Sequence, residues 1–108
     1  MEGNLKSLAR GSLQSSSSIL YSPPAGLRGV VTSFLISNKS SIDLTISIWF
    51  VLKSISVPFC PENFLLRAKY TVELIDERIG LEPGDYISGI ASLNSQVFFN
   101  IHGYEDIL

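Results

Sequence analysis

The sequence contains few of the residues on which most recognisable binding and catalytic sites depend. It has one cysteine, Cys60, and one histidine, His102. No disulfide can therefore form within the chain, and the Cys and His ligands of a zinc site are missing. Charged residues make up 17% of the chain, the formal net charge is −2, and Lys and Arg form no cluster. Because nucleic-acid binding needs a basic patch, we expect no direct contact with DNA or RNA.

The sequence also lacks a long apolar segment. The most apolar stretch, residues 42–52, is interrupted by polar residues and is well short of the ~20 residues that a membrane-spanning helix needs. Residues 1–14 include Lys6 and Arg10 but no continuous apolar stretch, unlike a secretory signal peptide. These features predict a soluble protein that is not exported by the general route and does not contact a membrane.

What is present fits one small globular domain. The chain has 108 residues, 45% of them hydrophobic, and a chain of this length buries enough surface for one core. The low charged fraction predicts that a partner covers part of the surface. Four consecutive serines at 15–18 are typical of a flexible hinge. We therefore expect an N-terminal arm over residues 1–16 and a β-sandwich domain over residues 17–108.

Residues 42–52 show the clearest pattern in the chain. Every second position is apolar, and the positions between are polar up to Ser47, as in a strand with one buried face. Residues 27–37 are rich in β-branched and aromatic side chains and are followed by the polar residues 38–41. We expect these two segments to form a hairpin.

Several shorter strands are predicted around these two. The strand at 54–61 contains Pro58 and Pro61, so it must be short and lie at a sheet edge. The others are predicted at residues 18–21, 68–75, 86–92 and 96–104. The alternation predicts a core that includes Leu44, Ile46, Ile48, Val72, Ile87 and Val97.

Turn signals separate the predicted strands. In the segment 81–85, Pro83 and Gly84 occupy the second and third positions of a type II turn. No convincing amphipathic helix is present, although residues 61–67 could form one helical turn. Short strands with frequent turns predict an all-β fold, an antiparallel β-sandwich of six to eight short strands that is jelly-roll-like or Ig-like.

The turn motifs resemble those of a group of small β-sandwich virion proteins of tailed bacteriophages. The resemblance covers residues 17–105 and includes Tyr21-x-Pro-Pro-Ala-Gly26, Leu81-x-Pro-Gly-Asp85-x-Ile87 and Gly103-Tyr104-Glu105. It implies a structural module of the capsid, neck, tail or baseplate, such as a decoration or cement protein, without catalytic residues. It also implies a trimer bound to other virion proteins in a particle that assembles in the host cytoplasm.

The candidate catalytic residues form no recognisable site. Cys60 lies between prolines and His102 lies within a predicted strand, so nothing brings this possible nucleophile and base together. The acidic residues could bind calcium or act as the paired acids of a glycosidase, but their spacing matches neither kind of site. We interpret them as solvated turn charges. They are Asp76, Glu77, Glu82, Asp85, Glu105 and Asp106. We predict no catalytic residue, no cofactor and no metal site.

Trp49 is the most informative residue. It lies with Val51 on the outward face of the strand at 42–52, so this face becomes apolar toward the strand's end. The same chain could cover Trp49, or it could belong to a protein interface or a sugar-stacking platform. A homo-oligomer interface would include Trp49, Val51, Tyr86 and Tyr104. The alternative is a carbohydrate- or receptor-binding module on the phage tail or capsid. Such a module would use the three aromatic residues Trp49, Tyr86 and Tyr104.

Overall fold

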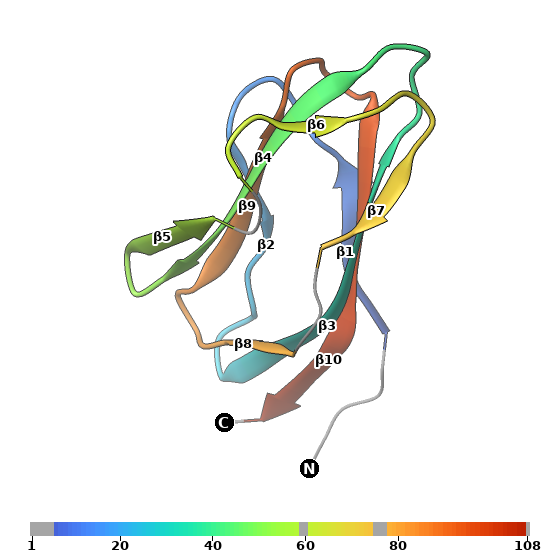
Figure 1. The fold of residues 1–108 in the computed structure, drawn as a ribbon. Coiled ribbons are helices and arrows are strands. Elements are labelled where there is room, and N and C mark those ends of the chain that lie inside the picture. The colour runs from blue at the N-terminus through green and yellow to red at the C-terminus, as the bar shows by residue number, and fades with distance from the viewer. Residues whose placement is uncertain (1–5, 59–60, 75–77, 108) are drawn as a thin grey trace.

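The computed structural model describes residues 6–58, 61–74 and 78–107, which form two antiparallel β-sheets packed face to face (Figure 1). The strands are β1 (Lys6–Ser12), β2 (Ser18–Tyr21), β3 (Leu27–Asn38), β4 (Leu44–Leu52), β5 (Ile55–Pro58), β6 (Phe64–Leu66), β7 (Thr71–Glu73), β8 (Ile79–Leu81), β9 (Tyr86–Ala91) and β10 (Val97–Ile107). The predicted all-β sandwich is confirmed, with ten strands in the described ranges instead of six to eight. In this part of the chain no helix has the length and apolarity needed to cross a membrane.

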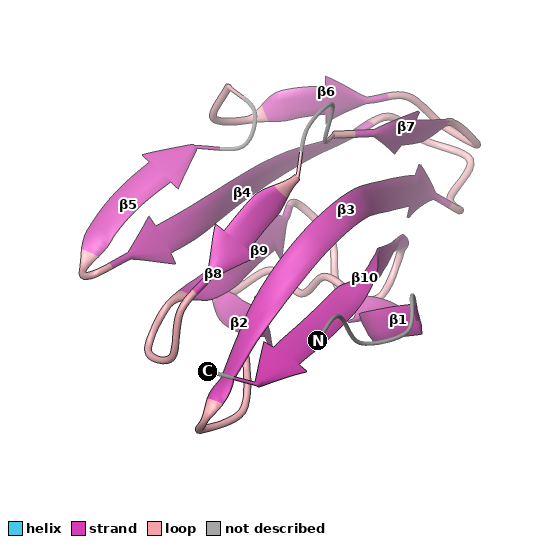
Figure 2. Cartoon of the chain, turned by 90° about the horizontal axis from the view of Figure 1, so that it is seen from below, coloured by secondary structure: helices cyan, strands magenta, loops and turns pink. Residues whose placement is uncertain are grey.

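The order of the strands identifies the kind of sandwich. One sheet, which we call the β3 sheet, has the order β1-β10-β3-β7, and β8 also pairs with β3. The other, the β4 sheet, has the order β2-β9-β4-β5, and β6 also pairs with β4. If β5 with β6 and β7 with β8 are each taken as one interrupted strand, this is the order of a jelly roll. Figure 2 shows the two sheets from below.

The hairpin predicted for residues 27–37 and 42–52 is wrong, because β3 and β4 lie in different sheets. The polar residues after β3 make the crossing between the sheets. Asn38 is buried, and its side-chain amide donates to the carbonyls of Ile42 and Leu66, both at 2.9 Å. Its carbonyl oxygen accepts the backbone N–H of Ser40 at 2.9 Å. A polar segment between two strands therefore indicates a turn, but not whether the chain stays in the same sheet.

The N-terminal arm predicted for residues 1–16 is not found over residues 6–13. β1 pairs with β10 along its length, and Leu13 is fully buried in the core. The serines at 15–18 connect this strand to β2 in the other sheet. The pairing of β1 with β10 shifts register between Ser7 and Ala9. Because this bulge interrupts the alternation, the strand has no clear period of two in the sequence.

The core lies between the two sheets, and most of its predicted members are there. Val72 is the exception, since it is half-buried and packs against the edge of the core. The other five are buried, namely Leu44, Ile46, Ile48, Ile87 and Val97. Long strands of the β3 sheet add Phe34, Ile36 and Ile101. The helical turn considered for 61–67 is not formed, because β6 occupies Phe64–Leu66.

The turn after β8 has the predicted geometry. Gly84 has φ of 95°, and the N–H of Asp85 donates to the carbonyl of Glu82 at 3.0 Å. Asp85 itself is only 5% exposed, so its interpretation as a solvated charge is wrong. Its carboxylate accepts the backbone N–H groups of Glu82 at 2.9 Å and Lys53 at 3.0 Å. The turn between β8 and β9 is thereby joined to the turn between β4 and β5.

Candidate protein interface

The outer face of the β4 sheet contains a row of side chains that crosses four strands. Trp49 on β4 lies opposite Ser88 on β9 and opposite Pro58 on β5. Ser88 in turn lies opposite Ile19 on β2. Because directly opposite residues of antiparallel strands share a face, these four residues form one continuous strip with Trp49 in its middle.

Three of the four predicted interface residues meet on this face. Val51, two residues beyond Trp49, lies opposite Tyr86, and it is buried, with 7% of its surface exposed. Tyr104 lies on β10 in the other sheet. Its ring packs against the guanidinium of Arg78, 5.9 Å away, and its hydroxyl accepts a hydrogen bond from Arg78 at 3.2 Å. Tyr104 therefore lies apart from Trp49, Val51 and Tyr86.

The two sheets differ in charge. The strands of the β4 sheet, all of them described, contain no charged residue. The strands of the β3 sheet contain Lys6, Arg10, Arg28, Glu73, Glu105 and Asp106. The outer face of an antiparallel sheet in water is normally polar, and soluble proteins usually have charges distributed over their surface. The outer face of the β4 sheet lacks them.

Large apolar side chains on this face are exposed. Ile19 is 62% exposed, and Leu65, which lies opposite Thr45, is 52% exposed. Trp49 and Ile90 are half-buried between them. An uncharged face with exposed apolar side chains and an aromatic residue at its centre is typical of a protein interface. The sequence did not indicate Ile19 or Leu65, because β2 and β6 are too short to show an alternation.

Two of the edge strands, β5 and β1, are less suited to association than this face. On β5, the backbone nitrogen of Pro58 has no N–H to offer a further strand. On β1, the charges of Lys6 and Arg10 and the bulge after Ser7 oppose the addition of a strand. The face of the β4 sheet is therefore a better candidate for contact with another molecule than these two edges.

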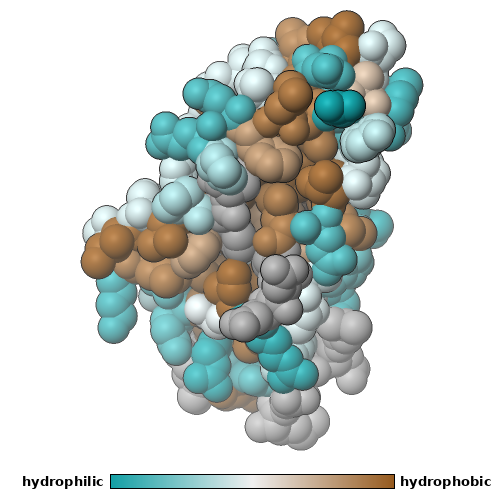
Figure 3. All heavy atoms as spheres, in the orientation of Figure 1, coloured by the Kyte–Doolittle hydropathy of each residue, from teal (hydrophilic) through white to brown (hydrophobic). Residues whose placement is uncertain are grey.

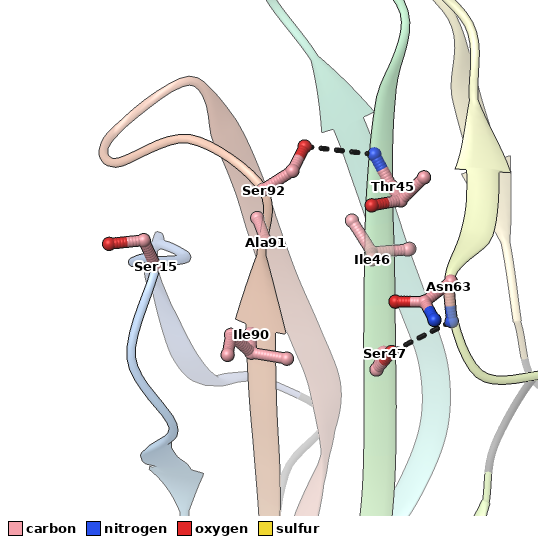
Figure 4. A pocket seen from close by; sticks show the side chains of 8 residues that line it. All are labelled: Ser15, Thr45, Ile46, Ser47, Asn63, Ile90, Ala91 and Ser92. Carbon is pink, nitrogen blue, oxygen red and sulfur yellow. Dashed lines mark hydrogen bonds between the residues drawn. The ribbon is translucent and has the colours of Figure 1, made fainter.

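A shallow hollow of about 210 Å³ lies at one end of the same face (Figure 4). Ser47 accepts the backbone N–H of Asn63 at 2.9 Å, and the Ser92 hydroxyl accepts the backbone N–H of Thr45 at 3.1 Å. The hollow is lined by Ser15, Thr45, Ile46, Ser47, Asn63, Ile90, Ala91 and Ser92. Hydroxyl and amide groups without charge suit a neutral polar ligand rather than an ion.

The candidate catalytic and metal-binding residues that the structure describes do not gather into one site. His102 lies on β10 opposite Ser7 and Ser33, while Cys60, Asp76 and Glu77 lie outside the described residues. Glu82 is within 3.8 Å of Arg28 at the surface. Within ranges 6–58, 61–74 and 78–107, no three His, Cys, Asp or Glu side chains are arranged to hold a metal ion.

Glu105 joins the two sheets instead of forming a site for a ligand. Its carboxylate accepts a hydrogen bond from the Tyr21 hydroxyl on β2 at 2.8 Å and lies 3.0 Å from the Lys6 ammonium on β1. Burial alone would raise the pKa of Glu105, but the hydrogen bonds from Tyr21 and Lys6, with the charge of Lys6, outweigh burial and lower it. Burial and the contact with Glu105 raise the pKa of Tyr21, so its hydroxyl remains a donor.

Comparison with known proteins gave no family model, no curated protein and no solved structure that matches the chain. A proposal about function therefore depends on the surface of the molecule and on the resemblance of its turn motifs.

Proposed function

We propose that this protein is a non-enzymatic structural module that self-associates and binds neighbouring proteins through the outer face of its β4 sheet. The observation that supports this proposal is the absence of charge from all five described strands of that sheet, together with the exposure of Ile19 and Leu65 on its outer side. Contact with another protein would remove this apolar surface from water, which is the main driving force of association.

The chemistry of this face favours a protein partner over a nucleic acid or an anionic membrane. Both of the latter attract basic side chains, and the strands of the β4 sheet have none. An uncharged face also creates no repulsion between two copies of a chain with net charge −2. A second copy of this protein is therefore a suitable partner.

We further propose a tailed-bacteriophage virion as the setting. The turn motifs around Gly26 and Gly84 resemble those of small phage virion proteins, and jelly rolls are frequent in viral capsid domains. This support is by analogy of fold and motif. On this proposal the protein is a trimer that acts as a decoration or cement protein, or as a neck or tail accessory protein, in a particle assembled in the host cytoplasm.

Light scattering of the purified protein tests self-association. We expect an oligomer at micromolar concentration and a shift toward monomer for Trp49→Ala, because loss of a central aromatic anchor typically costs ~2 kcal/mol or about 30-fold in affinity. Phe98→Ala is the matched control, since Phe98 is an exposed aromatic residue on β10 in the other sheet, and it should leave the mass unchanged. A monomeric wild-type protein, or equal effects of the two variants, would contradict the proposal.

The hollow supports one alternative function, a carbohydrate- or receptor-binding module. Trp49 lies two residues beyond Ser47 on the same face of β4, so a sugar could stack on the indole while its hydroxyls reach Ser47 and Asn63. This alternative predicts a monomer whose tryptophan fluorescence changes saturably when glycans are added, and whose response is lost in Asn63→Ala.

A further inference from the structure

A second apolar patch lies on the ribbon formed by the end of β4 and by β5. Lys53 and Ser54 have φ of 51° and 70°, the pair of positive values that a two-residue type I′ turn requires. The ribbon projects beyond the rest of the sandwich (Figures 1 and 2). Ile55, immediately after the turn, is 67% exposed. Apolar side chains gather at this projecting end in Figure 3.

This patch faces the opposite way from Trp49. Ile55 lies opposite Leu52, and Val57 lies opposite Phe50. Leu52 and Phe50 pack against the edge of the core, so Ile55 and Val57 belong to the core side of the sheet, where the ribbon extends past the other sheet. We call Ile55 and Val57 the ribbon patch, and Ile19, Trp49 and Leu65 the outer patch.

The turn of the ribbon is hydrogen-bonded to the turn between β8 and β9. The buried carboxylate of Asp85 accepts the N–H of Lys53 at the turn at 3.0 Å and the N–H of Glu82 at 2.9 Å. A surface that is ordered before binding loses less conformational entropy on association. The ribbon patch is therefore presented ready for contact.

We infer that the ribbon patch of one copy packs on the outer patch of the next, so that copies associate head to tail. This inference rests on the proposed self-association. A two-fold contact between two outer patches would bury Ile19 and Trp49 but leave Ile55 exposed on the opposite side of the sheet. A head-to-tail contact buries both patches of every copy, and repetition of such a contact closes into a ring when its rotation permits.

Both patches suit a second copy of the chain. Each copy supplies one of each, so the two occur in equal number in any assembly of this protein alone. The strand residues that form them are uncharged, so neither patch repels the other or requires an oppositely charged partner.

A mixing experiment tests the inference. Ile55→Lys damages only the ribbon patch and Ile19→Lys only the outer patch; both residues are exposed, so each variant should fold as the wild type by circular dichroism. We expect each variant alone to self-associate at least about tenfold more weakly, because a buried unpaired lysine is unfavourable. Their equimolar mixture should form a 1:1 dimer, because one intact ribbon patch can meet one intact outer patch. Ile107→Lys, at an 82% exposed isoleucine on β10, is the control and should associate normally.

The outcomes separate this inference from the proposal on which it rests. Full assembly of Ile55→Lys with loss of assembly in Ile19→Lys would overturn the head-to-tail contact and leave self-association through the outer patch intact. A mixture that remains monomeric while the wild type is oligomeric would also overturn it. A monomeric wild-type protein would overturn both. If Ile55→Lys does not fold, the same mixture is made with Ile55→Thr, which keeps a β-branched side chain at this position.

Discussion

Several polar residues of this protein have structural roles that their types alone do not reveal. Asn38 and Asp85 both occur in sequence segments typical of turns, and both are buried with hydrogen bonds to backbone groups from other parts of the chain. A short polar residue between strands is usually exposed, and for this reason the sequence favoured a solvated position for Asp85. Whether such a residue is buried depends on a turn or strand that lies next to it in space but is distant from it in sequence.

Glu105 makes the stability of the fold sensitive to acid. Its pKa is lowered in the folded state by the bonds to Tyr21 and Lys6, which outweigh the effect of burial. The contribution of its charged form is therefore complete above the ordinary pKa of Glu, about 4.3, and is lost as the pH falls through the lower folded value. We expect the difference in unfolding free energy between the wild type and Glu105→Gln to decrease from pH 6 to pH 3.

Urea denaturation of both proteins at each pH measures this difference. The other carboxylates titrate in both proteins, so their contributions to the unfolding free energy cancel. A difference that stays constant over this window would show that Glu105 is not held by these bonds.

At the scale of single elements, the sequence predicted which side of a strand is buried better than it predicted which strands pair. The alternation in residues 42–52 correctly placed Ile46 and Ile48 in the core and Trp49 on the outer side of β4. It did not show that β3 and β4, or β9 and β10, belong to different sheets. An alternating pattern depends on which side of a strand is buried, whereas the neighbour of a strand depends on contacts between distant segments.

β1 is the element for which sequence and structure differ most. The strand pairs with β10, and Leu13 immediately after it is buried beside Gly89 in the other sheet. Deletion of residues 1–12 should therefore lower the unfolding free energy by several kcal/mol or prevent folding, because it removes the pairing and exposes part of the core.

Thermal unfolding followed by circular dichroism measures this loss. Deletion of residues 1–5 is the comparison, since it leaves β1 intact. If the longer deletion has the same unfolding midpoint as the wild type, the segment acts as an arm outside the core after all.

At the scale of the whole molecule, the main feature is the difference between the two sheets. The jelly roll buries one side of each sheet in a common core and leaves two outer faces. The strands of the β3 sheet contain charged residues, and the strands of the β4 sheet contain none. The low charged fraction of the sequence predicted a covered surface, but only the strand order shows that the uncharged strands are neighbours. The central claim is that another protein molecule covers the outer face of the β4 sheet.

Acrylamide quenching of Trp49 tests this claim most directly, because Trp49 is the only tryptophan of the chain and lies in the middle of that face. Quenching should be measured over a dilution series that light scattering shows to span association. If the face is the interface, quenching should be weak in the oligomer, and it should increase as the oligomer dissociates while the emission moves to longer wavelength. If the mass falls on dilution while the quenching and emission of Trp49 stay constant, this face is not where the protein associates.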